Sequence, residues 1–300
     1  MLILEQRVEK IRIKGDLQNS NSSYEQLCIL EKQLETTEAE RVEIDFVGVK
    51  FIAANLFAVL GCIFQEFHDK HREVGGLTIG NIHPKIKQII QRNGFNNHLG
   101  WESISDDYNT VIPYRIFDVN RIDEYEEYLT NSLFSRQDLP DMSQGAKDEI
   151  KGSLLELFKN VKDHTTSHKI FTCGQYFRNS NMLYFTIVDE GETIPYNVAT
   201  YHVKKELPFE ENSLQWAMTE GNTTRDGMTP RGIGLSLIRD FVELNEGNFN
   251  IISGNENFEM GDKGSRYNVF ETAFPGTIVT IGLNLNDDAT YYSTTEDIQF

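Results

Sequence analysis

The sequence contains no apolar run of the roughly 20 residues that a helix needs to cross a bilayer. Residues 1–6 also lack the basic start and long apolar core of a secretory signal peptide. The three cysteines, Cys28, Cys62 and Cys173, lie far apart and form no Cys-x-x-Cys pair. This pattern is typical of reduced, mostly buried thiols. Together these absences predict a cytoplasmic protein.

Positive charge is scarce as well. The 28 lysine and arginine residues face 46 aspartate and glutamate residues, and the formal net charge is −18. Such a chain repels the phosphates of nucleic acids and of anionic membranes, so we expect neither as a direct partner. A small phosphorylated ligand is still possible, because Mg²⁺ and local backbone dipoles can supply the counter-charge.

The 300 residues are enough for two domains with their own cores. Residues 1–100 alternate between strand and helix signals. Strands are predicted over residues 8–13, 42–46 and 76–79, and helices over residues 53–71 and after Pro84. This order predicts a small α/β domain.

A polar row follows one helix in the second half of the chain. Residues 150–164 carry apolar side chains at helical spacing, and Glu156, Asn160 and His164 succeed each other at four-residue steps along the border of that stripe. The Asn160 carboxamide offers a neutral oxygen of the kind that Mg²⁺ accepts. Glu156 can orient or deprotonate a water molecule.

An acid ends a strongly apolar strand over residues 183–189. Asp189 is followed at the second position by Gly191. A carboxylate at a strand end can accept a hydrogen bond from an exocyclic amine, and a glycine allows a flat base to pack on the backbone.

A glycine-rich loop runs into an amphipathic helix at residues 231–238, read as Arg-Gly-Ile-Gly-Leu-Ser-Leu-Ile. The two glycines, Gly232 and Gly234, remove Cβ atoms where a backbone can approach a ligand closely. The free N–H groups at the start of the helix suit an anion such as phosphate.

These motifs resemble the boxes of the GHKL ATP-binding domain, which gyrase, heat-shock chaperone ATPases, histidine kinases and mismatch-repair ATPases share. The N-box is matched by Glu156-x-x-x-Asn160-x-x-Asp163-His164, the G1 box by Asp189-x-Gly191, the G2 box by Arg231-Gly-x-Gly-Leu235, and the closing Gly-Thr strand by residues 274–281. Residues 173–177, 186–191, 216–225 and 231–235 further resemble a group of bacterial proteins that fuse a STAS-like domain to this ATP-binding domain. The resemblance covers roughly residues 115–295.

The resemblance implies roles for individual residues. Asn160 would coordinate Mg²⁺, Asp189 would bind the adenine amine, and Glu156 would be the general base. The residues expected at the ATP site are Asn160, Asp163, His164, Asp189, Gly191, Thr193, Thr223, Thr224, Arg225, Arg231, Gly232, Ile233, Gly234, Leu235 and Thr277. Thr193 departs from the family pattern, which has a second glycine in the G1 box.

A second resemblance concerns the first hundred residues. Residues 42–60, 77–79 and 86–90 are similar to the STAS domain of anti-sigma-factor antagonists. In that family a phosphorylatable Ser or Thr begins the long helix, whereas this chain reads Ala53-Ala54-Asn55 there. The resemblance therefore implies a docking or dimerisation module without serine phosphorylation, and a homo- or hetero-oligomer formed through it.

The expected fold is α/β, with an α+β two-layer GHKL sandwich containing a mixed sheet preceded by a small STAS-like α/β domain. The expected divisions are a STAS-like domain at 1–100, a connector with a helix at 101–145, an ATP-binding domain at 146–290 and an acidic tail at 291–300. The leading functional hypothesis is a Mg-ATP-dependent regulatory ATPase that switches a protein interaction. An anti-sigma-type serine/threonine kinase acting on a small STAS-like partner and a non-hydrolysing ATP sensor are the alternatives. Sigma-factor control, stress signalling and phage defence all remain open.

Overall fold

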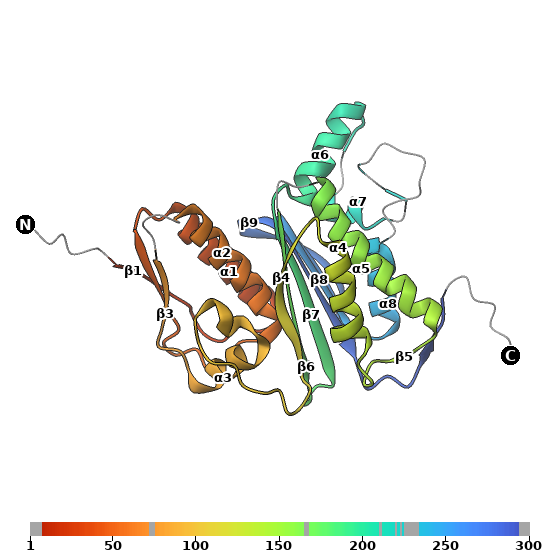
Figure 1. Ribbon diagram of the computed structural model, residues 1–300. Coiled ribbons are helices and arrows are strands. Elements are labelled where there is room, and N and C mark those ends of the chain that lie inside the picture. The colour runs from red at the N-terminus through yellow and green to blue at the C-terminus, as the bar shows by residue number, and fades with distance from the viewer. Residues whose placement is uncertain are drawn as a thin grey trace, which may run out of the picture.

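The chain is a mixed α/β protein with its helices and sheets in alternating layers (Figure 1). The computed structural model describes residues 8–71, 76–164, 168–209, 212–219, 221–222, 224 and 234–293, and only the backbone of Asp163 and His164. Across the molecule a three-stranded sheet is followed by a layer of helices, a five-stranded sheet and a second group of helices. Within these ranges no helix combines the length and the apolar character that a membrane span requires.

The first sheet is parallel throughout. Its strands β1 (Val8–Arg12), β2 (Arg41–Asp45) and β3 (Gly76–Gly80) lie in sequence order. Parallel neighbours require crossover connections, which are supplied by α1 (Asn21–Thr36) and by α2 (Phe57–Lys70) after the short turn η1 (Ala54–Leu56). The predicted strands and the predicted long helix are confirmed here, and α1 is an additional helix.

The helix predicted after Pro84 is α3 (Pro84–Asn93). Pro84 occupies its first turn, where the missing N–H costs nothing. Gly94 ends the helix with φ 90°, a left-handed conformation that favours glycine. A short turn, η2 (Phe95–His98), leads from α3 towards the second sheet.

The second sheet is antiparallel throughout its five strands. It comprises β4 (Val111–Asp118), β6 (Lys169–Phe177), β7 (Met182–Glu190), β9 (Gly264–Asn284) and β8 (Asn248–Gly261), in that spatial order. The expectation of a mixed sheet in this part of the chain is therefore corrected: among the described strands, this sheet is antiparallel and the parallel pairings lie elsewhere. A short parallel pair, β5 (Asp141–Met142) with β10 (Thr290–Tyr291), lies outside both.

Strand β4 falls in the segment expected to be a connector. It is an edge strand, and its register shifts between Ile112 and Arg115, where Pro113 lies. Proline cannot donate to a strand ladder and is tolerated at edges and bulges. The helix expected within the connector, residues 101–145, is present as α4 (Ile122–Tyr128) followed by a π-helical turn η3 (Leu129–Phe134).

Two helices, α5 (Gln144–His164) and α8 (Gly234–Leu244), cover one face of the five-stranded sheet, together with α4. The apolar stripe of α5, including Leu154 and Phe158, packs with Ile238 of α8 and with Phe185 and Ile281 of the sheet. At one end of this face lie α6 (Ile194–Lys205) and α7 (Ser213–Ala217).

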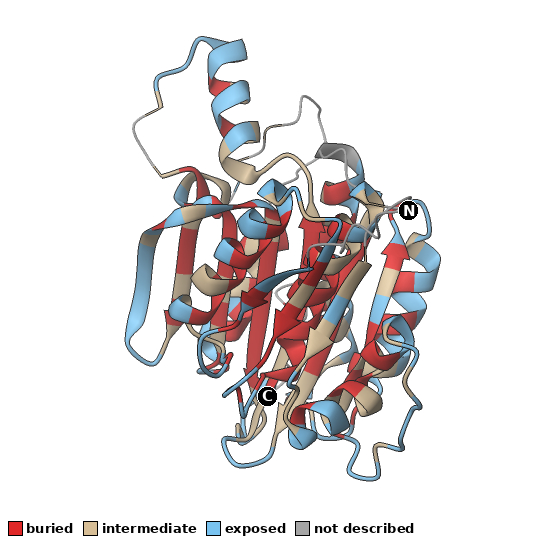
Figure 2. Ribbon diagram, turned by 90° about the vertical axis from the view of Figure 1, so that its left-hand side faces the viewer, coloured by how far each residue is buried: buried red, intermediate tan, exposed pale blue. Residues whose placement is uncertain are grey.

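The other face of the five-stranded sheet packs directly against α1 and α2. Phe171, Val188 and Ile278 of the sheet belong to the same buried core as Leu27 of α1 and Leu60 of α2. Figure 2 shows the central strands as almost wholly buried. The N-terminal layers and the second sheet therefore share one hydrophobic core.

A buried polar cluster lies within that core. The Asn55 side-chain amide donates to Asn19 Oδ1 at 2.8 Å and to Thr186 Oγ1 at 2.9 Å. The Tyr24 hydroxyl donates to Thr280 Oγ1 at 2.8 Å, and the hydroxyls of Thr280 and Thr186 lie 2.9 Å apart. Hydrogen bonding offsets the cost of burying these polar groups. It also fixes how the N-terminal layers sit on the five-stranded sheet.

Candidate functional site

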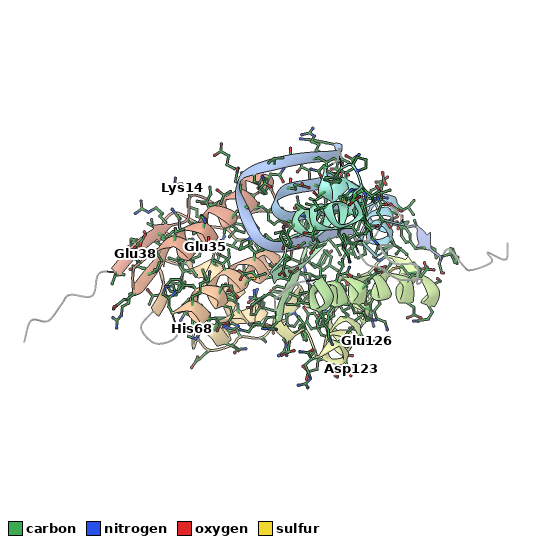
Figure 3. All side chains as sticks on the ribbon, turned by 90° about the horizontal axis from the view of Figure 1, so that it is seen from above. Lys14, Glu35, Glu38, His68, Asp123 and Glu126 are labelled. Atoms are coloured by element: carbon green, nitrogen blue, oxygen red, sulfur yellow. The ribbon has the colours of Figure 1, made fainter. Side chains whose placement is uncertain are left out.

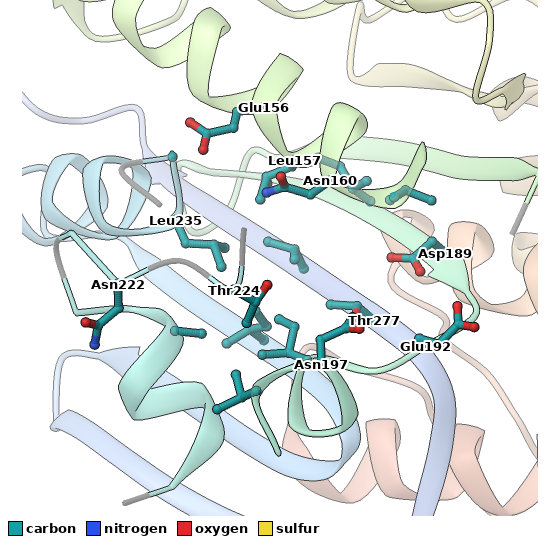
Figure 4. Close-up of a pocket in the computed structure, with 18 of the residues that line it drawn as sticks. Glu156, Leu157, Asn160, Asp189, Glu192, Asn197, Asn222, Thr224, Leu235 and Thr277 are labelled. Carbon is teal, nitrogen blue, oxygen red and sulfur yellow. The ribbon is translucent and has the colours of Figure 1, made fainter. Parts of the chain in front are cut away.

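A pocket lies on the sheet face covered by α5 and α8. It contains about 1020 Å³ of space, part of it open to solvent. Its apolar floor is formed by Ile187, Ile251 and Val279 of the sheet. Polar side chains enter from α5, the end of β7 and α6, and the start of α8 closes another side (Figure 4).

Helix α5 brings Glu156 and Asn160 to the pocket together. The two residues are one helical turn apart and therefore lie on the same side of the helix, as predicted. Their neighbours Leu157 and Val161 are buried and anchor this side of the helix to the sheet. The two side chains thus face the cavity from a rigid element.

Helix α8 begins against Glu156. Gly234 is its first residue, and a Cβ atom there would lie 2.9 Å from Glu156 Oε2. The absence of a side chain at Gly234 therefore lets the helix start pass beside the carboxylate. Leu235 also lines the pocket.

Asp189 lies at the opposite end of the pocket from Glu156, at the end of β7 (Figure 4). Its side chain is 6% exposed, and burial raises the pKa of its carboxyl to about 7. The Oδ1 atom is buried and has no hydrogen-bond partner among the described residues. Buried polar atoms are nearly always hydrogen-bonded, so this oxygen is suited to accept a donor from a ligand.

Thr277 of β9 is the cross-strand partner of Asp189. Its hydroxyl lies 2.9 Å from the hydroxyl of Ser253, which also accepts a hydrogen bond from the Ile194 N–H at 2.9 Å. A Cβ on the preceding Gly276 would lie 2.0 Å from the Asp189 carbonyl oxygen, so only glycine allows this approach. Close strand contact and this hydroxyl pair hold the Asp189 end of the pocket in place.

Gly191 and Thr193 follow Asp189 but line a neighbouring groove and not this pocket. Gly191 has φ 151°, which residues with a side chain rarely adopt. Thr193 has an ordinary φ of −75° and caps α6, its hydroxyl accepting a hydrogen bond from the Tyr196 N–H at 3.3 Å. Threonine at the position of the second family glycine therefore starts a helix without backbone strain.

Several expected site residues cannot be placed. Thr223, Arg225, Arg231, Gly232 and Ile233 lie outside the described residues, as do the side chains of Asp163 and His164. Of the expected loop residues, Thr224 lines the pocket.

The lining residues that were not predicted as site residues include Glu192, Asn197, Trp216 and Asn222. Asn222 donates from its side chain to the Trp216 carbonyl at 2.9 Å, which ties the segment after α7 back to that helix. The Trp216 ring packs on His202 of α6, with ring centroids 5.2 Å apart. Trp216 and Asn222 lie within residues 216–225, the segment that resembles the fusion proteins, whereas no role was expected for Glu192 or Asn197.

The pocket is acidic. Glu156, Asp189 and Glu192 line it, and none of the lining residues that the structure describes is basic. No group of three or more His, Cys, Asp or Glu side chains suited to a metal occurs in the described part of the chain. A divalent ion here would thus be held by the Asn160 oxygen together with oxygens of the ligand and water, as Mg²⁺ in phosphate sites often is.

Comparisons with known proteins gave no match of this chain to a protein-family model, to a curated protein or to a solved structure.

Proposed function

We propose that this pocket binds Mg-ATP and that the chain is a GHKL-type regulatory ATPase acting as a nucleotide-dependent switch for a protein interaction. The observation that carries the proposal is the Asp189 carboxylate, which is buried at one end of an apolar-floored pocket without a partner for Oδ1. An adenine amine is a donor of the required kind, and its flat ring suits the floor formed by Ile187 and Val279.

The opposite end of the pocket supports a phosphate site. Helix α8 begins at this end of the pocket, where the dipole of a helix N-terminus favours an anion, and the Asn160 oxygen is a ligand that Mg²⁺ accepts. Because acidic side chains line the described pocket, a triphosphate needs a cation to enter it. Asn160 would hold Mg²⁺, which would supply this positive charge.

Glu156 is the residue that we assign to hydrolysis. Its carboxylate would take a proton from a water molecule as the water oxygen forms a bond to the γ-phosphorus. The bond between that phosphorus and the bridging oxygen breaks, and ADP leaves with the electron pair. Asn160 and Glu156, one turn apart, would hold the metal-bound phosphate and the water on the same side of α5.

We assign residues 146–290 to a two-layer GHKL sandwich and residues 1–100 to a STAS-like domain. The helices α5 and α8 on one face of an antiparallel sheet support the first assignment. Three parallel strands with crossover helices support the second. Asn55 at the start of the long helix has no hydroxyl to phosphorylate, and it contacts Thr186 in place of solvent.

Incubation of the purified chain with γ-labelled ATP and Mg²⁺ tests the function. Release of labelled phosphate identifies an ATPase, and transfer of label to a small STAS-like protein identifies the kinase alternative. Binding without either product identifies a sensor, and no binding of Mg-ATP rules the proposal out. The Glu156→Ala variant is expected to keep ATP bound while turnover falls roughly 100-fold or more. Full hydrolysis by that variant would exclude Glu156 as the base.

A further inference from the structure

A second cavity lies beside the pocket, where the N-terminal layers meet the second sheet. It contains about 1420 Å³ of space, part of it open to solvent. Its walls come from α1, α2, the start of β6, the end of β7 and the first turn of α6. We call it the acidic groove after the six carboxylates that line it: Glu31, Glu35, Glu66, Asp69, Glu190 and Glu192.

The electrostatics of the acidic groove favour a cation. Three basic side chains, Lys70, His168 and Lys169, also line it, and Lys169 is already paired with Asp69 at 2.6 Å. Glu35 and Lys70 lie in the last turns of α1 and α2, so both helices end at the groove. Helix C-termini carry partial negative charge, which adds to that of the carboxylates. Figure 3 looks onto these helix ends, with Glu35 on α1 and His68 on α2 labelled.

Independent of the number of acids, Glu31 itself indicates a missing partner. It is only 4% exposed and lines the groove, yet no hydrogen bond or ion pair to its carboxylate occurs among the described residues. Burial raises its pKa to about 7. Oε1 of Glu190 is likewise buried without a hydrogen-bond partner in the described part of the chain. Unpaired buried carboxylates are costly, and a ligand that brings donors and positive charge removes that cost.

The shape of the site favours a peptide over a point charge. The acids are distributed over α1, α2 and the end of β7, and no metal-binding group occurs in the residues that the structure describes. The ring of Tyr196, 59% exposed, stands on the rim and can stack on a guanidinium group. Arginine and lysine side chains can reach separate carboxylates from one extended backbone.

We propose that the acidic groove is the docking site for an arginine- and lysine-rich segment of a protein partner. The site does not depend on the proposed nucleotide function, and binding is expected in the absence of ATP. Glu192 lines both cavities, so the docked segment lies against a wall that the neighbouring pocket shares. A conformational change in the neighbouring pocket can therefore reach the docked segment through this shared wall.

Fluorescence anisotropy with the full chain tests the proposal. The probe is a short fluorescein-labelled peptide of alternating arginine and glycine at low ionic strength, and the control peptide has glutamine in place of arginine. The combined substitutions Glu31→Gln, Glu66→Gln and Glu190→Gln neutralise the groove with little change of shape. The peptide affinity is expected to fall roughly tenfold or more, as for the loss of several buried charge contacts.

A matched variant carries the same loss of charge elsewhere. Glu38→Gln, Asp123→Asn and Glu127→Gln lie on exposed positions outside the groove. This variant is expected to bind the peptide with less than roughly twofold change. Equal losses in the two triple variants would mean attraction to the net charge alone and would overturn the proposal. So would no binding by the natural chain, or equal binding of the glutamine peptide.

Two further measurements keep the test decisive. Thermal unfolding shows whether the triple variant is folded. If it is misfolded, the double variant Glu35→Gln with Glu66→Gln replaces it, because both positions are less buried than Glu31. Its peptide affinity is expected to fall as well. Spermine and Mg²⁺ are titrated as competitors. If either binds with the same sensitivity to the groove substitutions while the peptide does not bind, the groove is a site for small cations and the proposal fails.

Discussion

Gly234, the first residue of α8, lies directly beside the carboxylate of Glu156 on α5. A Cβ on Gly234 would lie 2.9 Å from Glu156 Oε2, and 3.2 Å from its Cδ. Such distances are shorter than ordinary van der Waals contacts, so any larger residue displaces the carboxylate. The glycine at the start of α8 and the acid on α5 are therefore one structural unit, although 78 positions of sequence, from 156 to 234, separate them.

Gly234→Ala is expected to displace the Glu156 carboxylate and to lower ATP turnover roughly tenfold or more, because a small misplacement of a catalytic group is costly. ATP affinity should change much less. Gly152→Ala is the matched control, since Gly152 lies on the same α5 helix with open space around its Cα. It should stabilise the fold by up to about 1 kcal/mol and leave turnover unchanged. Equal turnover of the two variants would show that the contact does not position Glu156.

Asn160→Ala is expected to remove the dependence of ATP binding on Mg²⁺. The side-chain oxygen is the neutral ligand that we assign to the metal, and its loss should weaken binding in Mg²⁺ roughly tenfold or more. Asn160→Asp retains an oxygen at the same place and should keep the dependence. Calorimetric titration with ATP in Mg²⁺ and in EDTA measures both. Unchanged Mg²⁺-dependent affinity in Asn160→Ala would count against the assigned site.

The local part of this structure could be predicted from the sequence. Four-residue spacing places Glu156 and Asn160 on one side of a helix whatever the rest of the chain does. An apolar run that stops at Asp189 indicates a strand end, and α5 and β7 both occur where the periodicity predicts them. All three side chains line the same pocket.

The long-range part could not be predicted. Strand β4 was missed because Pro113 interrupts its pattern, and its place at the sheet edge depends on pairing with β6. The packing of α1 and α2 on the back of the second sheet joins residues far apart in sequence, such as Tyr24 and Thr280. The spacing of apolar residues along the sequence does not predict such contacts, because they depend on which surfaces pack together after the helices and strands have formed.

Removal of the Asn55–Thr186 hydrogen bond is expected to destabilise the whole chain. Asn55 is fully buried and its amide lies 2.9 Å from the Thr186 hydroxyl. Asn55→Ala should lower the free energy of unfolding by about 1–3 kcal/mol, and Thr186→Val by a similar amount. The two residues share one hydrogen bond, so their losses overlap. The double variant should therefore lose less free energy of unfolding than the sum of the two single losses, by about 0.5 kcal/mol or more. Denaturant titration measures this, with the exposed Asn131→Ala as control.

Strict additivity of Asn55→Ala and Thr186→Val would show that the two halves are not coupled through this bond. The shared core also predicts one unfolding transition for both sheets, because Phe171, Val188 and Ile278 lose their cover when α1 and α2 detach. Separate transitions in fluorescence and circular dichroism would contradict it.

The stability of the protein should fall with rising pH because of Asp189. The folded protein holds a proton on this acid up to about pH 7, whereas its unfolded value is 3.8. Between these values the folded state binds more protons, so stability decreases as pH rises and is constant above about pH 7. Glu31, whose pKa is also raised to about 7, acts in the same direction. The Asp189→Asn variant should lack the part of this pH dependence that comes from Asp189, which is at most roughly 4 kcal/mol in the free energy of unfolding.

ATP binding should release a proton from Asp189 when measured near pH 6. At that pH the buried carboxyl is mostly protonated, with its pKa near 7, and an amine donor from adenine favours the ionised form. Calorimetric titrations in buffers of different ionisation enthalpy report the number of protons released. Asp189→Asn cannot ionise, so it should release fewer protons and bind ATP more weakly, while GTP, which offers no amine there, should be affected less. Equal proton release by the natural chain and by the variant would mean that the adenine amine does not bind Asp189.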